Sequence, residues 1–371
     1  MRVLLVSGSF PPMKCGVGDY TACLAAALAA QPGVQVAVLT SAGAADGGKA
    51  TPVELFPVIR DWALREFPTV REVVQGWQPD VVHVQYPTQG YGKGMLPWLL
   101  PLAVRRRRRP VVQTWHEYFP GFAFLPGNRL PNWVPYALAL VPGEVVVVRP
   151  GYRAQMPRWW RMLTAHKLIE LIPNASAIPR VVLTAEERSA IRARLAPDGR
   201  AIVAFFGFLF EHKGVDDLLE VMDFGRQRLI LVGEVKEWDP YQVALVERIR
   251  REPLASSVTT TGYLSPTEAG RILAAADAVA LPVRTGAGSW NTSVHAAILQ
   301  GTFLLTTSLE RHGYDPDLHV YFARPGDLAD LRHGLEAHLG DRNLRAELED
   351  LLPTWKLVAA RHLAVYRRHV H

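Results

Sequence analysis

Residues 278–293 combine an apolar run, a glycine-rich turn and a helix start. The run Ala278–Leu281 is followed by the turn RTGAGS and then by Asn291, Thr292 and Ser293. Such a turn, and a helix N-terminus at the carboxyl end of a strand, present backbone N–H groups that bind phosphate. We therefore predict a phosphate-binding site here, with the N–H groups of Thr292 and Ser293 among its donors.

A second glycine-rich loop, CGVGD, follows the first apolar run of the chain, Val3–Ser7. Gly16 and Gly18 have no Cβ, so the backbone at these positions can approach a diphosphate closely. The alternative is a turn that needs positive φ angles and binds nothing.

Two histidines accompany apolar runs in the first half of the chain. His116 follows the run Val111–Thr114, and His83 lies inside the run Val81–Val84. We interpret His83 as a core residue. His116 is placed where a strand ends, which is where ligands bind in open α/β sheets.

The composition is that of a folded protein with more than one domain. The chain has 371 residues, of which 49% are hydrophobic and 20% charged, and this length suits two domains of roughly 100–200 residues each. Its two cysteines, Cys15 and Cys23, predict no disulfide framework and a reducing compartment. No apolar run reaches the roughly 18 residues that a membrane span needs. We therefore expect a cytoplasmic protein.

The charge is unevenly distributed along the chain. Residues 1–180 carry 19 Lys and Arg against 10 Asp and Glu, whereas residues 181–371 carry 22 against 25. A basic half suits an anionic partner such as a membrane surface or a phosphate-linked substrate. We expect no nucleic acid partner, because the sequence has no RNP-type, zinc-ligand or helix-turn-helix signature.

The alternation of apolar and amphipathic segments predicts an α/β fold with two doubly wound, Rossmann-like halves. Continuous Val, Leu and Ile runs are typical of strands buried on both faces of a parallel sheet. The first half has strands predicted at 3–7, 35–40, 81–84, 111–114, 145–148 and 168–172, and helices at 20–30, 62–75, 96–107 and 133–140. The second half has strands predicted at 201–206, 229–232, 258–261, 278–281 and 303–306, and a helix with Ser265 as its N-cap.

The proline-flanked segment Pro173–Pro179 is predicted to be the hinge between the halves. We place one domain at 1–180 and a second at 181–354, opened by a capping box of Thr184 and Glu187. The last helix, 355–371, is predicted to pack back on the first domain. Two such domains would face a central cleft in which a phosphorylated ligand binds.

Five segments between Val3 and Thr307 resemble glycosyltransferase family 4, whose members have the GT-B fold. They are SFPPMKCGVGDYTACLAAAL, PDVVHVQYP, VVQTWHEY, LIPNASAIP with VAFFGFLFEHKGVDDLLE, and LILVGE with the segment from Thr261 to Thr307. The resemblance implies transfer of a hexose from a UDP- or GDP-linked sugar, with retention at the anomeric carbon and without a metal or other cofactor. In such a reaction the leaving phosphate helps to deprotonate the acceptor, and the protein stabilises charge on the diphosphate.

The resemblance also implies roles for individual residues. Lys213 matches a lysine that contacts the diphosphate, and His116 matches a histidine near the donor hexose; these two form the predicted catalytic set. Phe208 stands where the family often has an arginine, and Arg284 is the candidate to replace that cation. The predicted donor-binding residues are Gly16, Gly18, Gly207, Gly233, Glu234, Tyr263, Leu264, Arg284, Gly288, Ser289, Asn291, Thr292 and Ser293.

Two glutamates of the family motif are missing from this chain. Gly288 and Ala296 occupy their positions, so neither the sugar contact nor the ribose contact has its usual carboxylate. Losing a charged acceptor of this kind costs about 1.5–3 kcal/mol of binding. The absence weakens donor binding without abolishing the reaction in principle.

The expected partners are a nucleotide sugar and a glycan, lipid-linked or cell-surface acceptor, as in polysaccharide biosynthesis. The segment Leu96–Arg109 ends in five arginines, and it is either a core helix with a basic end or a contact with an anionic membrane. In the second case the protein is peripheral on the inner face of the plasma membrane. The alternatives are a transferase of secondary metabolism with a small soluble acceptor, and a catalytically degenerate relative that acts as a binding subunit.

Overall fold

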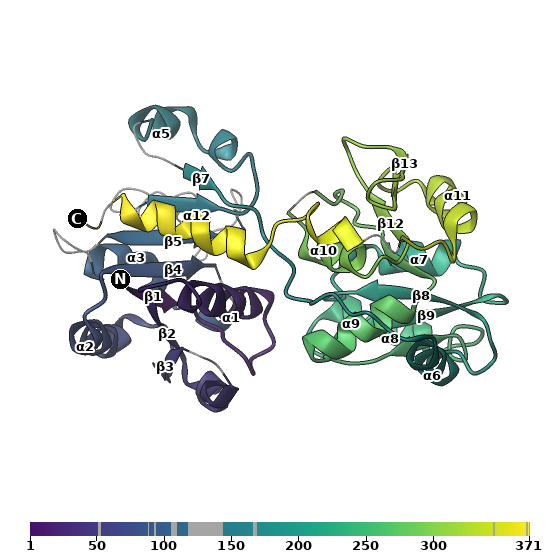
Figure 1. Ribbon diagram of the computed structural model, residues 1–371, viewed down its shortest axis with the longest axis horizontal. Coiled ribbons are helices and arrows are strands. Elements are labelled where there is room, and N and C mark those ends of the chain that lie inside the picture. The colour runs from purple at the N-terminus through teal and green to yellow at the C-terminus, as the bar shows by residue number, and fades with distance from the viewer. Residues whose placement is uncertain are drawn as a thin grey trace. The chain divides into compact units, whose positions relative to one another are not determined.

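The computed structural model describes residues 1–50, 53–87, 89–92, 94–104, 110–117, 144–165, 169–288, 290–343, 346–368 and 370. The chain divides into two compact units: unit 1 comprises Met1–Asn174 and Thr354–His371, and unit 2 comprises Ala175–Pro353. Each unit contains a sheet in which seven strands of the described residues pair (Figure 1). The helix predicted at 133–140 and the arginines at 105–109 lie outside the described residues.

The sheet of unit 1 is parallel throughout, in the order β3-β2-β1-β4-β5-β6-β7. Its strands are β1 (Arg2–Val6), β2 (Gln35–Ser41), β3 (Glu54–Ile59), β4 (Val81–Tyr86), β5 (Val111–Trp115), β6 (Glu144–Val147) and β7 (Ile169–Leu171). Its helices are α1 (Gly16–Ala29), α2 (Phe67–Trp77), α3 (Leu96–Val104), α5 (Arg158–Leu163) and α12 (Trp355–Arg367), with short 3₁₀ turns at Ala42–Ala50, Leu64–Glu66, Gln89–Tyr91 and Arg153–Gln155. The order reverses between β1 and β4, which makes this sheet doubly wound.

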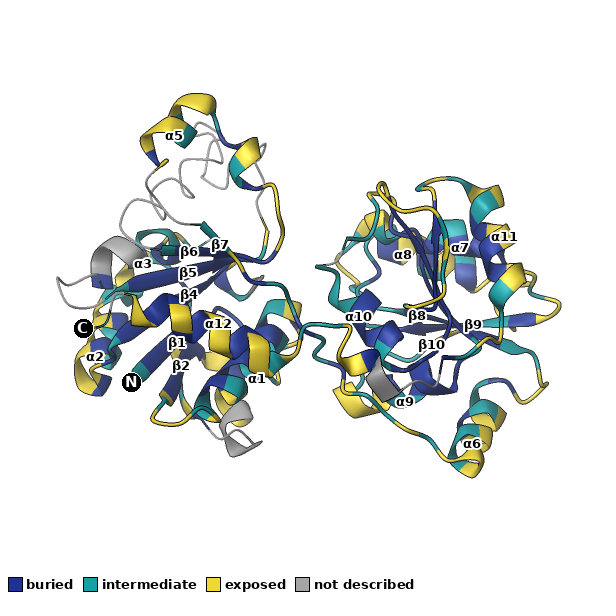
Figure 2. Ribbon diagram, turned by 45° about the horizontal axis from the view of Figure 1, so that its top comes forward, coloured by how far each residue is buried: buried dark blue, intermediate teal, exposed yellow. Residues whose placement is uncertain are grey.

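The inner strands of unit 1 are buried because helices cover the sheet. Every residue of β4 and β5 is buried, and these strands are dark blue in Figure 2. Helices α1 and α12 contact each other and lie side by side on the sheet (Figure 1). Thr354 caps α12 by accepting a hydrogen bond from the N–H of Leu357 at 3.2 Å. The C-terminal helix thus completes the unit that the N-terminus begins.

The sheet of unit 2 has the order β10-β9-β8-β11-β12-β14-β13, and only the pair β13–β14 of the described strands is antiparallel. Its strands are β8 (Ala201–Phe206), β9 (Gln227–Val232), β10 (Val258–Thr260), β11 (Ala278–Leu281), β12 (Leu304–Thr307), β13 (Gly313–Asp315) and β14 (Val320–Ala323). Its helices are α6 (Ala185–Leu195), α7 (Val215–Val221), α8 (Pro240–Ile249), α9 (Pro266–Ala275), α10 (Thr292–Leu299) and α11 (Leu328–His338), with 3₁₀ turns at Glu211–Lys213 and Ala346–Glu349. Strand order reverses between β8 and β11, so the loops after these strands flank the switch point at which α/β sheets bind ligands.

Two helix starts of unit 2 have the predicted capping boxes. The side chain of Thr184 accepts from the N–H of Glu187 at 3.2 Å, and the Glu187 carboxylate accepts from the N–H of Thr184 at 3.0 Å. Ser265 and Glu268 exchange the same two bonds at the start of α9. Both predicted helix starts are therefore confirmed.

The units divide after Asn174, six residues before the boundary placed at 180 from the sequence. Ile178 belongs to the hydrophobic core of unit 2. The side chain of Gln300 accepts from the N–H of Val181 at 2.9 Å and donates to the carbonyl of Pro179 at 3.0 Å. These bonds attach residues 178–181 to unit 2. The positions of the prolines in the sequence do not predict bonds to a residue as distant as Gln300.

Candidate functional site

Strands β8 and β9 are each followed by a glycine that the local structure requires. The N–H of Gly207 donates to the carbonyl of Val232 at 3.1 Å, and a Cβ on Gly233 would lie 2.2 Å from the carbonyl oxygen of Gly207. Gly207 also has φ +131°, a conformation that favours glycine. Both strands therefore end in bare backbone beside the switch point of the sheet, which permits close approach of an anionic group.

The start of helix α10 lies beside Gly207. A Cβ on Gly207 would be 3.3 Å from Oγ of Ser293, the second residue of this helix. Asn291 caps the helix, because its Oδ1 accepts a hydrogen bond from the N–H of Ser293 at 3.0 Å. This N–H is therefore bonded within the protein in this structure, and its contact with phosphate stays a prediction. The hydroxyl of Ser293 is the group of this residue that meets Gly207.

The loop that carries Lys213 is fixed to the segment that follows β11. Gly214 has φ +72°, and a Cβ on it would lie 2.1 Å from the carbonyl oxygen of Pro282. The N–H of Arg284 donates to the carbonyl of His212 at 2.9 Å. The sequence Glu-His-Lys-Gly thus forms a tight turn after β8, and the structure brings the half-buried Lys213 to the same end of the sheet as Gly207.

Arg284 takes part in a cluster of carboxylates. Its guanidinium lies 2.9 Å from Oδ1 of Asp217, 3.6 Å from Oε1 of Glu211 and 3.8 Å from Oδ2 of Asp216. The hydrogen bond to Asp217 is the main reason why the pKa of Arg284 is raised. The positive charge is therefore balanced within the protein, and the role of Arg284 as the replacement for the missing cation at Phe208 stays a prediction.

Lys236, which the sequence did not single out, brings a cation to Phe208. Its Nζ lies 5.8 Å from the centre of the Phe208 ring and 2.7 Å from Oε2 of Glu234. Both partners of this ion pair are largely buried, and they follow β9 directly. No spacing rule predicts the pair, because the lysine reaches Phe208 from the next loop of the sheet.

Tyr263 and Leu264 follow β10, the neighbour of β9 at the edge of the sheet. The Tyr263 ring is exposed, whereas Leu264 packs against the core of unit 2. Gly262, before them, has φ +75° and forms the turn that leaves the strand. The structure therefore places this segment beside the end of β9.

Trp290 occupies the space next to Gly288. A Cβ on Gly288 would lie 2.1 Å from two atoms of the Trp290 ring, and the N–H of Asn291 donates to the carbonyl of Gly288 at 3.0 Å. Ala296, at the second position where the family has a glutamate, is fully buried in α10. Ser289, another predicted donor-binding residue, lies outside the described residues.

In unit 1, Gly18 is a packing residue of helix α1. A Cβ on Gly18 would lie 3.2 Å from the backbone carbonyl of Ser9 and 3.3 Å from the backbone nitrogen of Phe10. The close approach that requires this glycine is therefore an approach to the protein's own loop. The diphosphate contacts of Gly18 and of the exposed Gly16, the first residue of α1, stay predictions.

His116 follows β5 and is half-buried. Its Nε2 lies 2.8 Å from Oε1 of Gln85, and its backbone N–H donates to the carbonyl of Tyr86 at 2.8 Å. Its ring packs edge-on against the ring of Tyr20, with the ring centroids 4.6 Å apart. Burial, with a smaller contribution from His362, lowers the pKa of His116 to about 3. The imidazole is therefore neutral at physiological pH and can accept or donate a hydrogen bond.

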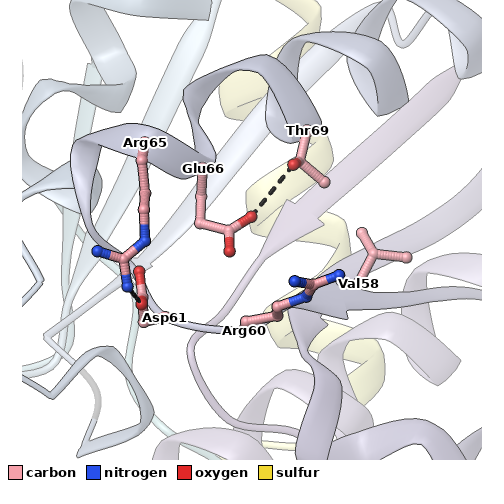
Figure 3. Close-up of a pocket in the computed structure, with 6 residues that line it drawn as sticks. All are labelled: Val58, Arg60, Asp61, Arg65, Glu66 and Thr69. Carbon is pink, nitrogen blue, oxygen red and sulfur yellow. Dashed lines mark hydrogen bonds and ion pairs between the residues drawn. The ribbon is translucent and has the colours of Figure 1, made fainter.

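A separate charged pocket lies at the edge of unit 1 (Figure 3). It is lined by Val58, Arg60, Asp61, Arg65, Glu66 and Thr69, and the Thr69 hydroxyl donates to Glu66 at 3.1 Å. Arg65 pairs with Asp61 across it. Edge strand β3 is separated from β5 by three strands, a distance of about 19 Å at normal strand spacing. The pocket is therefore distinct from the end of β5 that carries His116.

Comparisons with known proteins identify the family of the chain. The model of a glycosyl transferase 4-like domain matches residues 15–207, more than half of the chain, and the model of glycosyl transferases group 1 matches residues 187–311. The chain therefore belongs to the family 4 glycosyltransferases, and its two Rossmann-like units are those of the GT-B fold.

Particular relatives include one curated protein and two solved structures. A GDP-mannose-dependent alpha-mannosyltransferase of Mycobacterium tuberculosis is 30% identical over 207 residues, which is 49% of this chain and 47% of the relative. The sucrose-phosphate synthase of Thermosynechococcus elongatus has a TM-score of 0.69 at 18% identity and covers 99% of this chain and 98% of its own. Anabaena HepE, solved with UDP and glucose, has a TM-score of 0.65 at 18% identity, with 100% and 95% coverage. The chain thus spans about half the length of the curated relative that it matches.

The described residues contain no cluster of three or more His, Cys, Asp and Glu side chains that would hold a metal ion. Their helices include none with the length and apolar character needed to cross a membrane.

Proposed function

We propose that the protein transfers a hexose from a nucleotide diphosphate sugar to an acceptor, with retention at the anomeric carbon and without a metal. The observation that carries the proposal is the bare backbone at the ends of β8 and β9, beside Ser293 and the Lys213 turn. Backbone groups at such a switch point bind phosphates, and an ammonium group suits a diffuse diphosphate charge. Unit 2 is in this proposal the donor-binding unit.

The comparisons support a UDP- or GDP-linked donor. The curated relative is named for GDP-mannose, and the Anabaena structure contains UDP and glucose. Exposed Tyr263 after β10 is the proposed contact of the base, and Glu234 the proposed contact of a ribose hydroxyl. The ion pair with Lys236 holds the Glu234 carboxylate in place for that contact.

The proposed chemistry relies on the leaving diphosphate. In the proposed reaction the acceptor attacks on the face from which the diphosphate leaves, and its proton passes to the departing phosphate oxygen. Lys213 stabilises the charge that grows on the diphosphate as the bond to the sugar breaks. His116 contributes a neutral imidazole that hydrogen-bonds a hydroxyl of the hexose.

Turnover of donor sugars tests the proposal. Purified protein given UDP-glucose or GDP-mannose, with EDTA present, should release the nucleoside diphosphate, and NMR should show retained configuration in the product. Lys213→Ala should reduce kcat by about 10–100-fold, because a charged contact to the transition state is lost. Lys356→Ala, at an exposed position of α12, is the matched control and should turn over normally. Inversion of configuration, or full activity of Lys213→Ala, would contradict the proposal.

The proposed acceptor is lipid-linked, and helix α5 supports this choice. Trp159, Met162 and Leu163 lie at i, i+3 and i+4 and are exposed by 50%, 71% and 63%. The sequence between Glu144 and Glu170 contains five Lys and Arg and no Asp or Glu. Exposed apolar side chains among basic ones suit the interface of an anionic membrane.

Vesicle sedimentation tests the membrane contact. The protein should sediment with phosphatidylglycerol vesicles at low salt, because these vesicles are anionic and attract the basic residues of this segment. It should not sediment with phosphatidylcholine vesicles, which have no net charge, and high salt should weaken the binding by screening the charges. Trp159→Ala combined with Met162→Ala should release it. Trp238→Ala removes a tryptophan of unit 2 that is 69% exposed and serves as the control. Failure to sediment would favour a small soluble acceptor.

A second candidate function is binding without transfer. Trp290 fills the place of a side chain at residue 288, and Ala296 is buried, so two carboxylates of the family motif are absent. A binding subunit would bind nucleotide and show no turnover of any donor. The turnover assay therefore separates the two functions.

A further inference from the structure

One face of the unit 1 sheet carries polar side chains in its interior. His83 and Gln85 alternate along β4 and therefore point to the same face, and Gln85 is in register with Thr114 of β5. Helix α12 adds Tyr366 and His362 to this face. Buried polar side chains need hydrogen-bond partners.

These side chains form a connected series of hydrogen bonds. Nδ1 of His83 lies 2.6 Å from the hydroxyl of Tyr366, and its Nε2 lies 2.8 Å from the hydroxyl of Thr114 and 3.3 Å from Nε2 of Gln85. Oε1 of Gln85 lies 2.8 Å from Nε2 of His116. The series therefore leads from the C-terminal helix to His116.

The chemistry of the partners sets the direction of each bond. An amide oxygen only accepts, so His116 donates from Nε2 to Gln85. An amide nitrogen only donates, so Nε2 of His83 carries a lone pair. A neutral imidazole then has its proton on Nδ1, which donates to the hydroxyl oxygen of Tyr366. Burial lowers the pKa of His83 and of His116, which keeps both rings neutral.

His362 closes the same end of the series. Its Nδ1 donates to the carbonyl of Val358 at 2.8 Å, which leaves the lone pair on Nε2, 3.5 Å from the Thr114 hydroxyl. Thr114 donates to the nearer nitrogen, Nε2 of His83. Every nitrogen of the two buried rings thus has an assigned role.

We infer that Tyr366 of the C-terminal helix acts as a positioning residue, which fixes through His83 and Gln85 the tautomer of His116. In this arrangement His116 carries its proton on Nε2 and presents a lone pair at Nδ1. The imidazole is then a hydrogen-bond acceptor toward a substrate hydroxyl. The part of the inference that concerns substrate rests on the proposed function, whereas the tautomer itself does not.

Loss of the Tyr366 hydroxyl has a defined consequence. His83 would have no acceptor for its Nδ1 proton and would move that proton to Nε2, where Thr114 accepts it. Gln85 would then face a donor, rotate its amide and turn its NH₂ group toward His116. His116 would then accept a hydrogen bond at Nε2, and its proton would move from Nε2 to Nδ1.

Nitrogen-15 NMR of the full chain, labelled at histidine, measures this proton directly. In the wild type, His116 should have a protonated Nε2, assigned by the absence of its signals in His116→Gln. In Tyr366→Phe the proton should move to Nδ1. Retention of the wild-type pattern in Tyr366→Phe, or a wild-type proton on Nδ1, would overturn the inference.

Tyr91→Phe is the matched control. Tyr91 is also buried in unit 1, but its hydroxyl lies 2.8 Å from the backbone carbonyl of Gln85 and 3.2 Å from that of Val6. The variant should therefore lower the melting temperature without moving the His116 proton, and a shift of the proton here would count against the inference. Should Tyr366→Phe fail to fold, Gln85→Met breaks the same series and should give a mixture of both tautomers.

Kinetics distinguish this inference from the proposed function. Tyr366→Phe should lower kcat on the order of tenfold and leave the donor KM within about a factor of two. The reason is that the wrong tautomer of His116 loses a hydrogen bond that stabilises the transition state more than the bound donor. A moved proton with unchanged turnover would refute the role of His116 in catalysis and leave the positioning inference standing. An unmoved proton would refute the inference whatever the turnover.

Discussion

Trp290 takes the space that a side chain on residue 288 would need. The two positions are linked through the turn that leads into α10, since the ring atoms lie 2.1 Å from a Cβ placed on Gly288. No positive φ is involved at Gly288, so the constraint is the indole and not the backbone. The missing glutamate and the tryptophan are therefore one structural feature.

A double-mutant cycle tests this coupling. Gly288→Ala should destabilise the protein by about 1–3 kcal/mol, because its Cβ displaces the indole ring. In the Trp290→Ala background the same change should cost much less, since the ring is gone. Urea unfolding of the four proteins measures the coupling energy. Additive effects would show that the ring and residue 288 do not compete for space.

The sequence predicts site residues that depend on local turn chemistry. The Lys213–Gly214 loop and the helix start at residues 291–293 follow from neighbours along the chain, and the structure has both, with Asn291 as the cap of the helix. The partners of Arg284 and Lys236 come from other loops of the sheet. Their ion pairs depend on which strands are neighbours, so the order of residues alone does not give them.

Among the elements, α12 places the ionisable side chains of His362 and Tyr366 against the sheet face that contains His83. His83 and His362 are fully buried. Burial lowers the pKa of His83 well below its ordinary value and that of His362 to about 4. The contact between β4 and α12 therefore requires neutral imidazoles.

Stability should consequently depend on pH. Both folded-state pKa values are depressed, so the unfolded chain binds protons that the folded chain does not. The stabilisation is complete above pH of about 6.5 and declines as the pH falls, by up to about 2 kcal/mol for each histidine at pH 5. Urea unfolding between pH 7.5 and 5, followed by tryptophan fluorescence, measures this decline.

Two variants assign the pH effect to the buried rings. His362→Leu should reduce the pH dependence by about one proton, since one of the histidines with a lowered pKa, which also include His83 and His116, no longer titrates. His312→Gln alters an exposed histidine of unit 2 and should keep the wild-type slope. A stability that does not vary over this range would contradict the account of the β4–α12 contact.

The sequence predicted those helices and strands that have a capping box or a continuous buried apolar run. The capping boxes at Thr184 and Ser265 located two helix starts, and continuous apolar runs located the inner strands. Strand β3 was not predicted, because it is an edge strand that contains Pro57 and has few buried positions. Strand β14, which follows a turn and pairs with the short β13, was not predicted either.

For the molecule as a whole, the folding of unit 1 depends on residues from both ends of the chain. Unit 2 is one continuous segment, Ala175–Pro353, whereas unit 1 is completed by residues 354–371. Helix α12 buries Val358, Ala359, Leu363, Val365 and Tyr366 in unit 1. The valine and leucine side chains of this set contribute roughly 1.5–3 kcal/mol each, so together they are comparable with the stability of a domain.

Removal of residues 355–371 should therefore unfold unit 1 and leave unit 2 folded. Hydrogen exchange followed by mass spectrometry should show loss of protection in β4 and β5 and native protection in β8 and β9. A chain that lacks only residues 369–371 is the control and should keep both. Equal loss of protection in both units would mean that unit 2 depends on α12.

We propose that unit 2 binds a nucleoside diphosphate through the bare ends of β8 and β9 and the Lys213 ammonium. Calorimetric titration of the full chain with UDP and with GDP tests it most directly. We expect saturable binding of at least one of them, weakened about 10–100-fold by Lys213→Ala and unchanged by Lys356→Ala, because a charge-assisted contact contributes about 1.5–3 kcal/mol. Absence of binding by the folded protein, or wild-type affinity in Lys213→Ala, would contradict the claim.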